Sequence, residues 1–155
     1  MTDFAIHGLD PAPFADLFGL DEAALAARAV VRMAVTAKPG FPCRVTLEDA
    51  EIGEQVLLLN YIHLPDGPYA QRHAIFVREG AVVAGLYHNL IPDQLAIRTL
   101  SVRAYDAAGM MTDADLAEGG DLPVLIDRFF ADRSVAYLHA HNARRGCFAA
   151  RIDRV

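Results

Sequence analysis

Short turns separate most of the strand-forming segments of this chain, and this spacing limits its possible folds more than any other feature. Glu79-Gly80 follows one such segment, and Asp106-Ala-Ala-Gly109 ends another. Strands joined by turns this short pair antiparallel, because a parallel pair needs a crossover of a dozen residues or more. We therefore expect a mostly antiparallel sheet and not a parallel α/β arrangement.

The strand-forming segments differ in the faces that they would bury. Thr99 to Tyr105 alternates polar and apolar residues, which predicts a half-buried strand, whereas Glu54 to Leu64 is apolar on both faces, which is typical of a central strand. The other expected strands are Phe4 to Leu9, Val30 to Thr36, Ala74 to Arg78, Val82 to Leu86, Val135 to His141 and Cys147 to Asp153. We expect loops at Ala37 to Cys43, at Pro65 to His73 and at the acidic, glycine-containing stretch Asp113 to Asp121.

Two segments each begin with a residue that favours the start of a principal helix. Asp21 is a favourable N-cap for a helix that runs to Arg28, and Asp121 caps a second helix from Leu122 to Phe130. A capping-box spacing that begins at Thr46 predicts one further helical turn, which Gly53 closes. Together these elements predict an α+β fold, in which a mostly antiparallel sheet carries two principal helices packed on one face.

Length and charge exclude several classes of protein. The 155 residues fit one domain, so we expect a single domain over residues 1–155. A net charge of -6 disfavours nucleic acid as a partner, because non-specific binding to its backbone needs Lys and Arg that release counterions. No stretch approaches the roughly 18 apolar residues of a membrane span, and the N-terminus lacks a secretory signal. We therefore expect a cytoplasmic protein with no nucleic-acid partner and no membrane association.

The last two expected strands form a hairpin whose faces can be assigned. An odd-with-odd register places His141 opposite Cys147, with a five-residue connection from Asn142 to Gly146. The aliphatic face, to which Phe148, Ala150 and Ile152 belong, would then point to the core. The opposite, polar face gathers Tyr137, His139, His141, Cys147 and Arg151.

This polar face has three interpretations, which the residues alone leave open. It can be an exposed sheet face or an interface with a partner. It can be a small-molecule or catalytic site, where His139 or His141 exchanges protons near pH 7 and Arg145 or Arg151 holds an anionic group. It can also hold zinc through His139, His141 and Cys147. The zinc interpretation has the least support, because no second Cys or carboxylate stands at a fixed ligand spacing, so we assign no metal and no cofactor.

Further polar residues stand where they would line a pocket. Tyr61 and His63 share one face of the central strand, and the next loop ends on Arg72 and His73. Cys43 precedes Arg44, and a neighbouring cation favours the reactive thiolate form, although two small buried thiols are the simpler interpretation of this chain's cysteines. The candidate catalytic residues are His139, His141 and Cys147. The candidate substrate-binding residues are Cys43, Arg44, Tyr137, Asn142, Arg145, Arg151, Arg72 and His73.

Three segments together carry a resemblance to a known family. They are Pro39-Gly-Phe-Pro-Cys-Arg44 with the following Leu47 to Glu54, Pro68-Tyr69 leading into Ala74 to Val77, and His141-Asn-Ala-Arg-Arg-Gly-Cys147. With the strand end Arg103-Ala-Tyr-Asp106, the chain resembles an uncharacterised bacterial family, domain of unknown function 1203, over essentially its whole length. The resemblance implies a single domain and supplies no reaction.

Two functions follow as competing expectations. The first is a small-molecule-binding protein or enzyme for a compact anionic metabolite, with a histidine as acid or base and an arginine as anchor. The second is a non-catalytic interaction module, a homodimer whose contact is the polar sheet face or an edge strand. Packing of the Cys43 loop near the terminal hairpin would join Cys43, Arg44, His139, His141, Arg145 and Cys147 in one polar cluster.

Overall fold

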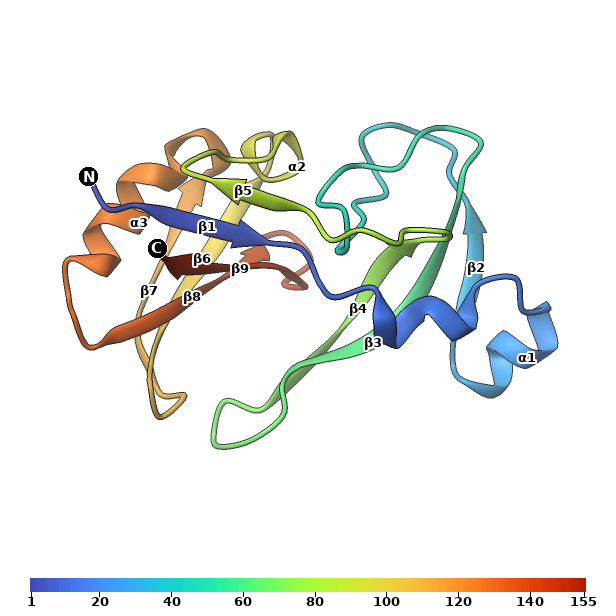
Figure 1. Cartoon of the computed structure of the whole chain (residues 1–155), viewed down its shortest axis with the longest axis horizontal. Helices are drawn as coiled ribbons and strands as arrows, with labels where there is room; N and C mark the ends of the chain where they lie inside the picture. Colours follow the sequence, from blue (N-terminus) through green and yellow to red (C-terminus); the bar gives the residue numbers. More distant parts are fainter.

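Two antiparallel sheets make up most of the molecule, which we describe from a computed structural model of all 155 residues (Figure 1). The six-stranded sheet has the order β5-β1-β9-β8-β6-β7, and the three-stranded sheet has the order β2-β3-β4. The large sheet contains β1 (Phe4–His7), β5 (Leu86–His88), β6 (Thr99–Asp106), β7 (Met111–Glu118), β8 (Val135–Asn142) and β9 (Phe148–Arg154). The small sheet contains β2 (Val31–Ala34), β3 (Gln55–Leu64) and β4 (Gln71–Arg78). The prediction of a mixed fold with mostly antiparallel sheets is confirmed.

The helices are short and lie on different sheets. They are α1 (Glu22–Ala27), α2 (Asp93–Ala96) and α3 (Leu122–Phe130), with 3-10 turns η1 (Ala12–Leu17) and η2 (Gly119–Asp121). Helix α1 packs beside β2 of the small sheet, whereas α3 packs beside β7 of the large sheet. The expected pair of principal helices on one face of a single sheet is therefore not what the chain forms. None of these helices has the length and apolar character that crossing a membrane requires.

The N-cap predicted for α1 is confirmed, whereas the N-cap predicted for α3 is wrong. The carboxylate of Asp21 accepts a hydrogen bond from the backbone N–H of Ala24 at 2.7 Å, as an N-cap does. Asp121 makes no such bond, which corrects the expectation that it caps α3. The reason is its backbone: Asp121 ends η2 with φ -95° and ψ 2°, whereas an N-cap needs an extended conformation to turn its side chain onto the helix.

The acidic stretch Asp113 to Asp121, expected to be a loop, is mostly strand. Its first residues belong to β7, which pairs with β6 through the predicted turn at Asp106 to Gly109. Strand β7 is an edge of the large sheet, and Asp113 and Asp115 are exposed on it. Charged residues on an edge strand discourage pairing with another chain. The composition that suggested a loop is therefore that of a protected edge.

Two other expectations near the loops are wrong. Val82 to Leu86 forms no strand, because the backbone here follows the loop after Cys43, and Gly85 N–H donates to the carbonyl of Val45 at 2.8 Å. Strand β5 begins only at Leu86. The capping box at Thr46 produces a turn and no helix.

Each sheet has its own hydrophobic cluster. The cluster of the large sheet lies between it and α3, whose residues Leu122, Leu125, Ile126 and Phe129 repeat at helical spacing and are buried. The cluster of the small sheet includes Leu25, Cys43, Val45, Leu57, Ile75 and Val77. The single-domain organisation stays a prediction.

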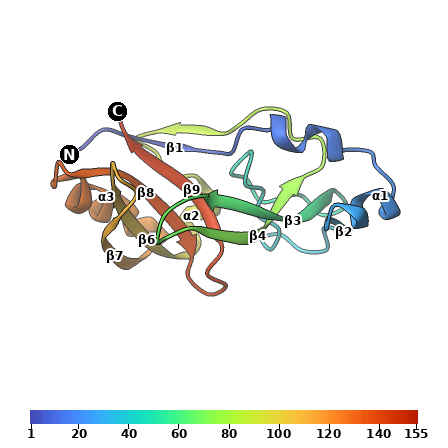
Figure 2. The ribbon, with the colours of Figure 1, turned by 90° about the horizontal axis from the view of Figure 1, so that it is seen from below.

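The hairpin of β3 and β4 extends from the small sheet across the large one (Figure 2). Tyr61 on β3 lies 6.0 Å from Phe148 between ring centroids, and Arg103 on β6 donates to Gln71 on β4 at 3.1 Å. Side chains alternate across a strand, so Leu138 and Ala140 of β8 face the α3 cluster and the residues between them face this hairpin. The centre of the large sheet, at β8, is thus covered on both sides.

A bulge changes the register of the terminal hairpin. His139 pairs with Arg151 and Ala140 with Ala150, but His141 pairs with Phe148, so Ala149 is an extra residue on β9. The expected pairing of His141 with Cys147 is wrong, because Asn142 extends β8 and its N–H donates to the Cys147 carbonyl at 2.9 Å. The bulge also turns Phe148, expected in the core, onto the polar face.

Candidate functional site

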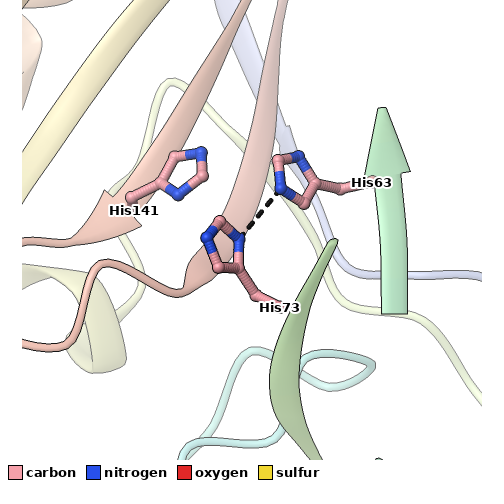
Figure 3. Close-up of side chains that lie close together, drawn as sticks. All are labelled: His63, His73 and His141. Carbon is pink, nitrogen blue, oxygen red and sulfur yellow. Dashed lines mark hydrogen bonds between the residues drawn. The ribbon is translucent and has the colours of Figure 1, made fainter. Parts of the chain in front are cut away.

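Four histidines meet where the β3–β4 hairpin covers the large sheet. His63 and His73 come from the small sheet, whereas His139 and His141 come from β8 of the large sheet. The rings of His63 and His73 are stacked with centroids 4.9 Å apart, and the ring of His141 stands edge-on to His63 at 5.1 Å (Figure 3). Phe148 packs against His63 at 5.0 Å. We call His63, His73, His139 and His141 the histidine cluster.

Strand irregularity positions this cluster. In the β3–β4 ladder, Ile62 pairs with Arg72 and Leu64 with Gln71, which leaves His63 as the extra residue of a bulge. Bulges are more frequent beside functional sites than elsewhere in sheets, and there they change the direction of a side chain. Here the bulge brings His63 against His73, and its Nε2 lies 2.9 Å from Nδ1 of His73 in a hydrogen bond.

The hydrogen bonds fix one tautomer and leave other nitrogens unpaired. His141 Nδ1 lies 2.9 Å from the carbonyl oxygen of Gly146, which only accepts, so Nδ1 carries the proton and Nε2 a free lone pair. His141 Nε2, His63 Nδ1 and His139 Nδ1 are buried without a hydrogen-bond partner. Such atoms are rare in folded proteins and call for an explanation.

Burial keeps the cluster neutral. It lowers the pKa of His139 and of His141 from 6.5 to about 3, and the pKa of His63 to about 4. The positive charge of Arg103 acts in the same direction on all three. This lowered pKa disfavours the expected proton exchange of His139 or His141 near pH 7, because desolvation favours the neutral imidazole. The catalytic role of both residues stays a prediction.

A cavity of about 830 Å³ opens beside the cluster. Its wall contains four arginines and no carboxylate, and His73 is the member of the histidine cluster that reaches it. Phe41, Phe76 and Ile97 give the wall an apolar part. The four arginines are Arg44, Arg98, Arg144 and Arg145, and Asn142 and Cys147 lie on the same wall.

Arg44 is the most unusual residue of this wall. The residue is only 2% exposed. Its guanidinium group donates hydrogen bonds to the carbonyls of Phe148 and Pro42, each at 2.7 Å, and to Cys147 Sγ at 3.1 Å. It makes no ion pair with a carboxylate. Desolvation lowers the pKa of Arg44, since removing a cation from water without an opposite charge is costly.

Close backbone packing holds Arg44 in position. Leu9 N–H donates to the carbonyl of Arg44 at 2.9 Å, and Arg44 N–H donates to the carbonyl of Phe76 at 2.9 Å. A Cβ at Gly8 would lie 1.9 Å from the Val45 oxygen, so only glycine permits the approach of β1 to this loop.

The other arginines of the wall differ in how their charge is balanced. Arg98 forms a two-bond ion pair with Asp49, at 2.8 and 3.0 Å, and this pair is largely buried. Arg144 and Arg145, on the turn between β8 and β9, form no ion pair. The cavity therefore faces three guanidinium groups whose charge no carboxylate of the protein offsets, namely those of Arg44, Arg144 and Arg145.

The structure separates the residues that the sequence nominated. The cavity wall brings together Arg44, His73, Asn142, Arg145 and Cys147. His139 and His141 lie in the adjoining cluster. Cys43 turns its thiol away from both, into the core of the small sheet, where Sγ accepts from the N–H groups of Thr46 and Arg78 at 3.5 and 3.3 Å. Of the six residues expected in one polar cluster, Arg44 and Cys147 are in contact and Cys43 lies apart.

Three nominated residues lie elsewhere. Arg72 bonds to Asn60 on the exposed part of the small sheet. Arg151 pairs with Asp153 at 2.8 Å and stands 4.2 Å above the ring of Tyr137, away from the cavity. The zinc set of His139, His141 and Cys147 does not assemble, because Cys147 is bound to Arg44 and the histidines that converge with His141 are His63 and His73.

Sequence reasoning missed Arg98, Arg103 and the pairing of His63 with His73. Continuing the alternation of β4 back to Gln71 would have moved His73 from a loop end onto the strand, opposite Tyr61. No pattern in the sequence indicates Arg98, which reaches the wall through α2.

The two histidines of the polar sheet face are buried within the chain. His139 and His141 are 3% and 0% exposed, because β3 and β4 of the same chain cover them. These two side chains are therefore not available to a second subunit, and the homodimer stays a prediction.

Comparison with known proteins identifies the family and nothing more specific. A search of curated proteins gives no match, and neither does a search of solved structures. The sequence profile described as protein of unknown function (DUF1203) matches residues 40–154, a segment that holds the Arg44 loop, the histidine cluster and all of the cavity wall except Met33. This match covers well over half of the chain, and the chain belongs to the DUF1203 family.

Proposed function

We propose that this protein binds a small organic anion in the cavity between its two sheets. The observation that carries the proposal is Arg44, a buried guanidinium with neutral partners only, in a wall that has three further arginines and no carboxylate. An anion in the cavity would supply the opposite charge that the protein itself withholds.

Size and surface favour an organic molecule over a bare inorganic ion. Pockets for small molecules usually measure about 300–1,000 Å³, and the cavity of about 830 Å³ falls in this range. Phe41, Phe76 and Ile97 would pack against carbon atoms of the ligand, while the arginines hold a carboxylate or phosphate. The expected anionic metabolite thus has both a charged and an apolar part.

The alkylation rate of the Cys147 thiol can report whether the cavity attracts anions. Its sulfur accepts a hydrogen bond from Arg44 and also faces the amide of Asn142 at 3.8 Å. The thiolate of a cysteine is its nucleophilic form. We assign Cys147 a place in the binding wall; an enzymatic role for it, a cytoplasmic location and a homodimeric state remain predictions.

The test compares two alkylating reagents that differ in charge. Iodoacetate and iodoacetamide each form a carbon–sulfur bond with a thiolate and release iodide, but only iodoacetate is an anion. We expect the rate ratio of iodoacetate to iodoacetamide at Cys147 to exceed, by roughly tenfold, the ratio for the same residue in the urea-unfolded chain. Peptide mass spectrometry distinguishes Cys147 from the buried Cys43.

Two arginine variants provide the control. Arg145→Gln should lower the rate ratio, whereas Arg133→Gln, which removes the same charge from an exposed turn outside the cavity, should leave it unchanged. Equal rate ratios in the folded and unfolded chains would show that the cavity does not select anions and would refute the proposal.

A further inference from the structure

We infer that His63, His73 and His141 bind a divalent transition-metal ion of the zinc class. Each ring offers one nitrogen, and these three nitrogens lie within 4.8 Å of one another. The rings come from three strands, β3, β4 and β8, and converge from both sheets (Figure 3). The inference does not depend on anion binding in the cavity.

The spacing of the His63 and His73 nitrogens needs little change to accept a metal ion. Zinc–nitrogen bonds of about 2.0–2.1 Å in a tetrahedral site place two ligand nitrogens about 3.4 Å apart. His63 Nε2 and His73 Nδ1 now lie 2.9 Å apart in a hydrogen bond, and an ion would replace the shared proton. Separating these atoms by about half an ångström requires small rotations of two partly exposed side chains.

His141 is already prepared as a ligand. Its Nδ1–H is held by the Gly146 carbonyl, which orients the ring and leaves the lone pair on Nε2. Metal-bound histidines almost always donate their second nitrogen to a carbonyl or carboxylate in this way. Nε2 is buried and has no partner in the protein, so an ion would satisfy an atom that is otherwise unpaired.

The donor set determines the kind of ion. Three imidazoles suit Zn²⁺, Co²⁺, Ni²⁺ or Cu²⁺, whereas Mg²⁺ and Ca²⁺ require oxygen ligands. No cysteine or carboxylate joins the three histidines, so a fourth position remains for water or a bound molecule, as in catalytic zinc sites. His73 also lines the cavity, which gives that position a route to the ligand-binding space.

The surrounding charge determines what accompanies the ion. Arg103 and Arg44 both act on His73, and no carboxylate is close enough to offset a divalent cation. Repulsion from these guanidinium groups would weaken the binding of a bare ion, so we expect an anion as the fourth ligand. This expectation separates the site from structural zinc sites, which are closed by protein ligands.

The test is a titration of the tag-free full chain with Co²⁺ after treatment with EDTA. Co²⁺ replaces Zn²⁺ and reports four-coordinate nitrogen ligation by intense visible absorption. We expect one Co²⁺ per chain, displacement by Zn²⁺ but not by Mg²⁺, and tighter binding in chloride than in perchlorate. No organic anion is added, so failure of the anion proposal would leave this result unaffected.

The neighbouring histidine gives a matched control. His141→Gln and His73→Gln should each weaken Co²⁺ binding by more than the roughly 10- to 100-fold that loss of a supporting partner costs. His139→Gln, which removes a buried imidazole beside the three ligands but outside the set, should leave the stoichiometry and the spectrum unchanged.

Three results would overturn the inference. They are no stoichiometric binding by the wild-type chain, an octahedral spectrum, or equal losses in His139→Gln and His141→Gln. His73 is only partly buried, so His73→Gln tests the site even where His141→Gln fails to fold.

Discussion

At the centre of β8, the two faces of the large sheet are equally buried but by different chemistry. On β8, Leu138 and Ala140 face α3 and are 0% exposed, while their neighbours His139 and His141 face the β3–β4 hairpin and are 3% and 0% exposed. The α3 face is a continuous hydrophobic cluster. The other face is a layer of imidazole and aromatic rings that contains three unpaired nitrogens.

The difference shows what burial alone does not explain. A leucine or valine layer would join the two sheets without loss, whereas each unpaired buried polar group costs about 1–3 kcal/mol. The histidine face therefore contributes less to stability than its buried area suggests, and its polar atoms fit a role in binding. The α3 face stabilises the fold by hydrophobic packing and presents no polar side chain for binding.

The strongest test of this contrast is a cavity on the α3 face. We expect Leu138→Ala to lower the free energy of unfolding by about 2–5 kcal/mol, because it removes buried methyl groups from a close-packed cluster. Urea unfolding at pH 7 measures the change. A loss below about 1 kcal/mol would indicate that the α3 face is loosely packed and would remove the contrast.

Acid should act on the histidine face. The pKa of His139 is about 3 in the folded protein and near 6.5 when unfolded, so between these values only the unfolded chain binds the proton. The free energy of unfolding should therefore fall as the pH drops below 6.5, by up to about 1.4 kcal/mol per pH unit for each such histidine. His139→Gln should reduce the loss between pH 6 and pH 5 by about 1 kcal/mol.

The control for the acid effect lies on the adjacent residue. Leu138→Ala should lower stability at both pH values without altering the difference between them. An unchanged pH dependence in His139→Gln would mean that His139 is not held neutral by burial.

The smallest effect is expected at the rim of the histidine face. Arg151 is half-exposed, pairs with Asp153 and stacks on Tyr137, and exposed contacts of this kind contribute about 1 kcal/mol or less. Arg151→Gln should thus change the urea midpoint only slightly. A loss comparable to that of Leu138→Ala would show that the rim, and not the α3 face, stabilises the sheet.

The sequence pattern correctly predicted the features that depend only on neighbouring residues. The alternation of Thr99 to Tyr105, the capping by Asp21 and the turn at Asp106 to Gly109 all appear as expected. The bulges at His63 and Ala149 escaped prediction, because an inserted residue alters the register without a distinct composition. The acidic edge strand escaped for the opposite reason: its charges look like those of a loop.

The site was half predicted. Arg44 was nominated beside Cys43, and Cys147 and Arg145 were nominated from the terminal hairpin; the fold brings all three to the cavity wall. Arg98 was not nominated, and His63 was noted beside a pocket without its contacts to His73 and His141, because contacts between sheets are not encoded in sequence spacing. Cys43 was nominated by its neighbour and then placed in the core, because successive side chains point to opposite sides of an extended segment.

The hydrogen bond from Arg44 to the Phe148 carbonyl spans 104 positions of the chain. Contacts of such long sequence separation form late and slowly, because the intervening loop must lose its entropy before the contact is made. The cavity wall therefore cannot exist on a nascent chain until β9 has left the ribosome and paired with β8. Anion selectivity at Cys147 would thus appear only once this contact has formed, and its onset would time that event.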